Sequence, residues 1–167
     1  MPHPILVCTY TNVAVDNLVE GLIASGVKPL RVGSGSNVRS SLLEHTLDHK
    51  LEAHPLQPTL ARLIKRKEEL SARMMDLESR LSEVRRKEFD GTKGLTKRSE
   101  NMQRLILNMQ NGQQALKSKI YAMQQQMLRD VILDADVVGK SHNSTCENIS
   151  IKDHFYRFAR HASHLRA

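Results

Sequence analysis

Thr9, Tyr10, Thr11 and Asn12 form a short polar segment that follows an apolar run near the start of the chain. Hydroxyl and amide side chains of this size can bind phosphate oxygens through hydrogen bonds that do not depend on the identity of a base. If a helix begins directly after them, its first N–H groups lack partners within the helix and add further donors for an anion. The segment is therefore a candidate phosphate-binding turn.

The residues on either side of this turn predict a strand and a helix that would position it. Ile5, Leu6, Val7 and Cys8 form a continuous apolar run, typical of a strand buried on both faces of a parallel sheet. A helix after the turn is predicted by apolar residues spaced three and four apart (Val13, Ala14, Val15, Leu18, Val19, Leu22 and Ile23). Thr11 or Asn12 would cap that helix, and capping alone is the simpler interpretation of both side chains.

A second strand and a short helix are expected next in the first segment, residues 1–57. Gly26 is placed to end the first helix in a left-handed conformation, and residues 28–32 then predict a strand that completes a β-α-β unit. Pro29 indicates the start or the edge position of that strand. Four leucines predict a short helix before a proline-containing linker (Leu42, Leu43, Leu47 and Leu51).

Residues 58–133 predict two helical arms that pair as an antiparallel coiled-coil hairpin. The apolar seam of the first arm contains one lysine (Leu60, Leu63, Lys67, Leu70, Met74, Leu77, Leu81 and Val84). A turn at residues 89–94 precedes a second arm with nearly the same spacing (Met102, Leu105, Met109, Gln113, Leu116, Ile120, Met123 and Met127). The methionines suit packing within this seam, and a groove for a protein partner is the alternative.

The charge of the chain favours an anionic partner. The formal net charge is +7, and the excess of basic residues lies outside residues 1–57. Basic residues of the first arm either contact nucleic acid or pair with acids on a solvated face (Arg62, Lys65, Arg66, Arg73, Arg80, Arg85, Arg86 and Lys87, with Glu68, Glu69, Glu78 and Glu83). Two distant cysteines give no disulfide framework, and no apolar run approaches the roughly 18 residues of a membrane span. We therefore expect an intracellular protein, cytoplasmic or nuclear, with no membrane partner.

The last part of the chain predicts one more strand and no metal site. Residues 134–138 are expected to return to the sheet as a third strand, and residues 139–167 form a basic, histidine-containing tail that we expect to be disordered. Gly139, Lys140 and Ser141 match the end of a nucleotide-phosphate loop, but Asp134 stands where its first glycine belongs. The tail residues that could bind zinc match no established spacing (His142, Cys146, His154, His161 and His164).

The run ILVCTYTNVAVDNL, residues 5–18, resembles the first nucleic-acid-binding motif of superfamily-one helicases of the Upf type, which act in nonsense-mediated decay. The later features are similar to the family in their order. Residues 31–33 resemble its next strand, SLLEHTLDHKL its linker, the helical hairpin its inserted stalk and ADVV its returning strand. The resemblance covers residues 4–138 and implies an α/β fold: a partial RecA-like parallel sheet of the P-loop NTPase type, with the hairpin as a long insertion.

The resemblance also implies a function. Enzymes of this family move along single-stranded RNA or DNA and use ATP and Mg²⁺, and the matching positions that contact the phosphate backbone are Thr9, Thr11 and Asn12. This chain contains no G-x-x-x-x-G-K-[ST] loop and no aspartate–glutamate pair at a strand end, so we expect no ATP or Mg²⁺ site and no catalytic residue in it. The expected function is that of a helicase fragment that binds nucleic acid without ATPase activity of its own. A coiled-coil module that binds a protein partner through the hairpin is the alternative.

Overall fold

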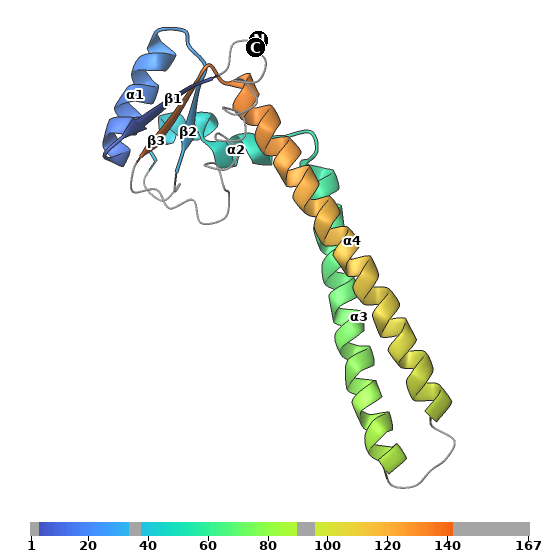
Figure 1. Cartoon of the computed structure of the whole chain (residues 1–167). Coiled ribbons are helices and arrows are strands. Elements are labelled where there is room, and N and C mark those ends of the chain that lie inside the picture. Colours follow the sequence, from blue (N-terminus) through green and yellow to red (C-terminus); the bar gives the residue numbers. More distant parts are fainter. Residues whose placement is uncertain (1–3, 34–37, 90–95, 142–167) are drawn as a thin grey trace, which may run out of the picture. The chain divides into compact units, whose positions relative to one another are not determined.

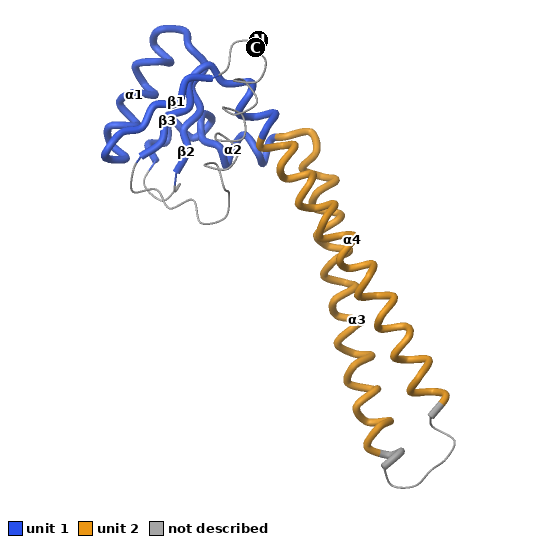
Figure 2. The backbone as a smooth tube through the Cα atoms, viewed as in Figure 1, with its two compact units in different colours: residues 1–53, 129–167 blue, residues 54–128 orange. Residues whose placement is uncertain are grey.

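The computed structural model of the chain describes residues 4–33, 38–89 and 96–141. These residues belong to two units (Figure 2), of which unit 1 comprises residues 1–53 and 129–167 and unit 2 comprises residues 54–128. Most of the predicted turn at residues 89–94 and the histidine-containing tail from residue 142 lie outside the described residues, as do residues 1–3 and 34–37.

Three parallel strands form the sheet of unit 1 (Figure 1): β1 (Ile5–Thr9), β2 (Pro29–Val32) and β3 (Val137–Ser141), in the order β1-β3-β2. The strand from the far end of the sequence therefore lies between the two strands of the predicted β-α-β unit. Pro29 is the first residue of a strand with one neighbour in the described sheet, as predicted. The returning strand begins and ends three residues later than the predicted residues 134–138, because Asp134 still belongs to α4 and Gly139, Lys140 and Ser141 continue the ladder instead of opening a tail.

The prediction that β1 is buried on both faces is wrong for this chain. Ile5 is 64% exposed, Leu6 is 42% exposed and the Cys8 thiol is exposed. The physical reason is that β1 is an edge strand of the described sheet, and that η2 and α2 pack against β2 and not to a comparable extent against β1. An apolar run predicts strand and parallel pairing correctly here, but burial depends on the elements that cover the two faces of the strand.

Helix α1 (Asn12–Ala24) follows β1 and packs against the sheet, as the apolar spacing predicts. Val15 and Val19 are buried together with Leu42. Gly139 of β3 permits this close approach, since a Cβ atom added to it would lie 3.3 Å from Cγ1 of Val15. Gly26 follows the end of the helix with φ of 75°, which confirms the predicted left-handed terminator.

The short helix predicted at residues 42–51 is two elements. A 3₁₀ helix, η2 (Ser40–His45), is followed by helix α2 (Leu47–Glu52). Thr46 separates them because its backbone is extended (φ −79°, ψ 149°), and it forms an isolated bridge with Arg31 of β2. The Thr46 hydroxyl accepts a hydrogen bond from the His49 N–H, so the same residue that ends η2 caps α2.

Two long helices account for unit 2: α3 (Gln57–Phe89) and α4 (Thr96–Asp134), the last six residues of which belong to unit 1. Pro58 stands in the first turn of α3, where its missing N–H costs no helical hydrogen bond. The apolar residues that are buried on these helices include Leu60, Met74, Leu81, Ile106, Ile120, Met127 and Leu128. The predicted seam is wrong at Leu105, which is 48% exposed while its neighbour Ile106 is buried. Coiled-coil pairing of the two arms stays a prediction.

Ion pairing on α3 differs from the predicted pattern. Among the described side chains of this helix, Arg80 pairs with Asp76 at 3.0 Å, one turn away. The pairs expected with Glu68, Glu69, Glu78 and Glu83 are not found among these side chains. None of the helices in the described part of the chain is long and apolar enough to cross a membrane.

Candidate nucleic-acid interface

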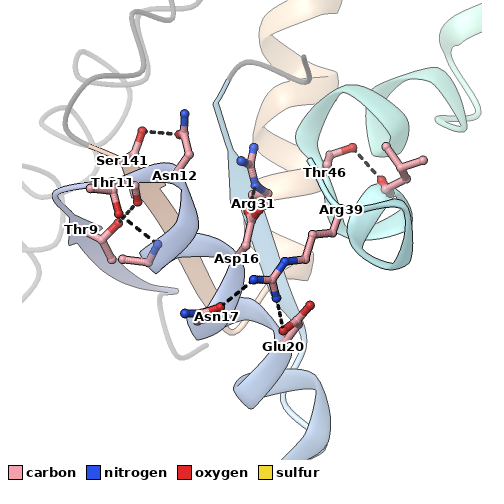
Figure 3. A network of polar contacts seen from close by, with 12 residues as sticks. Thr9, Thr11, Asn12, Asp16, Asn17, Glu20, Arg31, Arg39, Thr46 and Ser141 are labelled. Carbon is pink, nitrogen blue, oxygen red and sulfur yellow. Dashed lines mark hydrogen bonds and ion pairs between the residues drawn. The ribbon is translucent and has the colours of Figure 1, made fainter. Parts of the chain in front are cut away.

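The polar turn between β1 and α1 is held by its own hydrogen bonds (Figure 3). The Thr9 hydroxyl donates to the Thr11 carbonyl oxygen at 2.9 Å. The Thr11 hydroxyl oxygen accepts from the Ala14 N–H at 3.2 Å, so Thr11 is the N-cap of α1. These two contacts fix the angle at which the chain leaves the sheet and enters the helix.

Asn12 is tied to the neighbouring strand. The Ser141 hydroxyl at the end of β3 donates to Oδ1 of Asn12 at 2.7 Å, although 129 residues separate the two in the sequence. Ser141 also lies opposite Thr9 in the register of β1 and β3. Sequence reasoning missed Ser141. The available signal was its place directly after the returning strand, because the carboxyl ends of parallel strands meet at one edge of a sheet.

Several hydrogen-bond donors remain at this edge. Among the described residues, no acceptor is found for the N–H groups of Asn12 and Val13, for the carboxamide N–H groups of Asn12 or for the hydroxyl proton of Thr11. They lie at the N-terminus of α1, where the helix dipole also favours a negative charge. The structure thus brings Thr9, Thr11 and Asn12 together at the carboxyl end of β1, next to Ser141 of β3.

A buried ion pair anchors the first turns of α1 to the sheet. Nε of Arg31 in β2 lies 2.6 Å from Oδ1 of Asp16 in α1, and the two side chains are 1% and 5% exposed. Nη1 and Nη2 of Arg31 are buried without a hydrogen-bond partner in the described part of the chain. The pair was not predicted. A signal existed, because Asp16 lies one residue from Val15 on the apolar stripe and Arg31 interrupts the apolar residues of a strand.

A second, exposed contact joins α1 to the segment before η2. Arg39 donates to Glu20 at 2.6 Å and to Oδ1 of Asn17 at 3.1 Å (Figure 3). The hydrogen bond and the charge of Glu20 raise the pKa of the Arg39 guanidinium above its usual value, so this group stays protonated throughout the range in which proteins are stable. The contact therefore persists as an ion pair at neutral pH.

The run of Gly139, Lys140 and Ser141 does not form a nucleotide-phosphate loop in the structure. Gly139, Lys140 and Ser141 extend β3, and Lys140 lies between Cys8 and Val32 in the ladder. Successive N–H groups of an extended strand point to opposite neighbours, whereas a phosphate loop directs them at one anion. In the same described part of the chain, no three histidine, cysteine or acidic side chains are grouped closely enough to hold a metal ion.

The architecture and a family match together indicate the class of protein. A small parallel three-stranded sheet, a helix after its first strand and long helices before its last strand are compatible with part of a P-loop-type α/β domain. Residues 1–157 match the AAA domain family, and the chain belongs to this helicase-like, superfamily-one family. This match confirms the helicase-like, superfamily-one family that the sequence predicted, while the assignment to the Upf type stays a prediction.

One relative is a named helicase. A stretch of 44 residues is 46% identical to the DNA polymerase alpha-associated DNA helicase A of Schizosaccharomyces pombe (strain 972 / ATCC 24843). The match covers 26% of this chain and 7% of that protein. The chain therefore corresponds to a small part of the relative.

Proposed function

We propose that the chain is part of a superfamily-one helicase of the Upf type, in which the turn from Thr9 to Asn12 binds the phosphate backbone of single-stranded RNA or DNA. Membership in the AAA domain family and the similarity to a DNA helicase support the class of function. The observation that carries the site is the cluster of donors without acceptors at the start of α1, directly beside the end of the sheet.

The chemistry of the turn suits a backbone contact. Its donors are neutral hydroxyl, carboxamide and backbone groups, which bind phosphate oxygens but do not read the edges of bases. Tyr10 lies in the same turn and is 80% exposed, so its ring offers a surface on which one base can stack. Binding of this kind tolerates any sequence, as movement along a strand requires.

Binding of a fluorescent 15-nucleotide single strand, measured by anisotropy at two salt concentrations, tests this proposal. Thr11→Asp keeps an N-cap oxygen and places a negative charge against the phosphate, so affinity should fall by about tenfold or more. Thr11→Ser keeps the cap and the hydroxyl and should bind like the parent chain. Loss of the Tyr10 ring in Tyr10→Ala should weaken binding to any sequence by a similar factor.

Ser25→Asp is the matched control. Ser25 follows the other end of α1, and 13 residues at about 1.5 Å each place it roughly 20 Å away, beyond the Debye length of about 10 Å at 0.1 M salt. It makes the same change in net charge and should have little effect. Equal weakening by Thr11→Asp and Ser25→Asp would show that the effect is one of overall charge and would refute the site.

We also propose that this chain alone does not hydrolyse ATP. Its sequence has no phosphate loop, and the one glycine–lysine–serine run belongs to β3. The test is phosphate release by the purified 167-residue chain in the presence of single-stranded RNA or DNA. Release well above that of Lys140→Ala would contradict the proposal.

A further inference from the structure

An open groove of about 580 Å³ lies between α3 and α4 near the middle of unit 2. The apolar residues of its lining are Leu70, Met109, Ala115 and Leu116. Leu70, Met109 and Leu116 are each only half-buried, whereas Met74 and Ile120, a turn further along their helices, are buried. The groove is therefore a local interruption in the apolar packing of the two helices.

The sequence explains where this interruption falls. The predicted seam carries a lysine at Lys67 and a glutamine at Gln113, so apolar contact between the helices lapses at these positions. Gly112 has no side chain to fill the space, and a Cβ atom added there would lie 3.9 Å from Cδ2 of Leu70, at an ordinary contact distance. Room is left for a side chain that this chain does not supply.

The charged residues that line the groove are mostly basic. Arg66 and Arg73 of α3 and Lys119 of α4 line it, with Glu69 as the acidic residue among its lining. In the described part of the chain, these three cations take part in no ion pair or side-chain hydrogen bond. Three cations without a described partner, together with four apolar residues in the same lining, favour a ligand that is apolar along one stripe and acidic along its borders.

We propose that this groove binds an amphipathic α-helix of a partner protein, one whose apolar stripe is flanked by glutamate or aspartate. Two helices that leave a gap in their shared apolar surface accept the ridge of a third helix, and Met109 can adjust its shape to the side chains that enter. A nucleic-acid strand would leave the apolar lining residues unused and would find no aromatic ring among the lining residues on which to stack. This site is separate from the proposed nucleic-acid contact and does not rest on it.

A synthetic helical peptide of about 20 residues serves as the probe, with leucine at every third or fourth position and glutamate on both sides of that stripe. Its fluorescence anisotropy is measured with the full 167-residue chain. We expect binding in the micromolar range, at least about tenfold weaker binding of a scrambled peptide of the same composition and no competition by a 15-nucleotide single strand. Displacement of the peptide by the oligonucleotide would overturn the choice of a protein helix.

Two kinds of variant locate the site. The first is a triple charge reversal in the lining, Arg66→Glu, Arg73→Glu and Lys119→Glu, which should weaken peptide binding by at least about tenfold. Its control is the same charge reversal at three exposed residues outside the lining (Lys65, Arg85 and Lys117), which should change peptide binding by less than about twofold. Gly112→Leu should block the groove, and Ala122→Leu on the exposed surface of α4 is its matched control.

Circular dichroism confirms that each variant keeps its helices, and Gly112→Leu should be at least as helical as the parent because leucine favours helix over glycine. Equal effects of the two charge-reversed triples, or unchanged binding in Gly112→Leu, would refute the groove as the docking site. The Thr11→Asp variant should bind the peptide normally, so failure of the nucleic-acid proposal and failure of this one give different results.

Discussion

Removal of the Asp16 carboxylate should destabilise unit 1 more than any other single loss of charge in it. Asp16 and Arg31 are 5% and 1% exposed and 2.6 Å apart, so Asp16→Asn leaves a guanidinium buried without an opposite charge. Two of the guanidinium nitrogens already lack a partner among the described residues, which leaves Nε of Arg31 with the one strong contact. Loss of one member of a buried pair costs about 3–5 kcal/mol, a large part of the roughly 5–15 kcal/mol that typically separates folded from unfolded states.

Urea denaturation followed by circular dichroism measures this effect as a change in the free energy of unfolding. The matched control is Glu20→Gln, because Glu20 and Arg39 are also 2.6 Å apart but are 41% and 45% exposed. Solvent screens that pair, so its loss should leave the unfolding midpoint nearly unchanged. The comparison isolates burial, since the shortest nitrogen–oxygen distance is the same in both pairs.

The double variant Asp16→Leu, Arg31→Leu completes the test. Removal of both charges also removes the cost of burying them, so the double variant should be more stable than either single one. Equal losses of stability in Asp16→Asn and Glu20→Gln would refute the reasoning about this buried pair. A double variant whose loss of stability equals the sum of the losses in Asp16→Leu and Arg31→Leu would also refute it.

Four smaller effects follow from glycines and from the helix cap. Gly139→Ala should destabilise the chain by about 1–3 kcal/mol in thermal unfolding, because the new Cβ atom would lie 3.3 Å from Cγ1 of Val15. Gly21→Ala should instead stabilise the chain by about 0.5–1 kcal/mol, because a Cβ atom added at Gly21 would have no neighbour within 4 Å and alanine favours helix over glycine. Gly26→Ala should cost about 1 kcal/mol, since φ there is 75°, and an unchanged melting temperature would contradict the left-handed terminator. Thr11→Ala should cost about 1 kcal/mol through loss of the cap, and Thr11→Ser should recover most of it when hydrogen exchange of the first turn of α1 is measured.

Local patterns in the sequence were enough to predict most elements of the fold. The apolar run of β1, the three-and-four spacing of α1 and the glycine at its end each express a preference of a few neighbouring residues, and the structure confirms all three. Burial of β1 could not be predicted in this way, because it depends on the strands beside it and the helices over its faces and not on its own residues. The split between η2 and α2 depends in the same way on the bridge from Thr46 to Arg31, a contact between distant parts of the chain.

The candidate site was predicted in part for the same reason. Thr9, Thr11 and Asn12 are neighbours in sequence, so their shared position at the start of a helix follows from local structure. Ser141 and the pair of Asp16 and Arg31 join elements that are far apart in sequence, and such contacts need the order of the strands, which the spacing of residues does not specify. Charged residues inside apolar stripes are the signal that could have indicated the buried pair.

Titration of the isotope-labelled chain with a single-stranded 15-nucleotide RNA or DNA tests the central claim most directly, since changes in amide chemical shift report each residue that the strand approaches. The account predicts that the largest changes fall at Tyr10, Thr11, Asn12 and Val13, that they are the same for different base sequences, and that they diminish in Thr11→Asp. Changes confined to the basic residues of α3 and α4, with the amides of the turn unaffected, would contradict it.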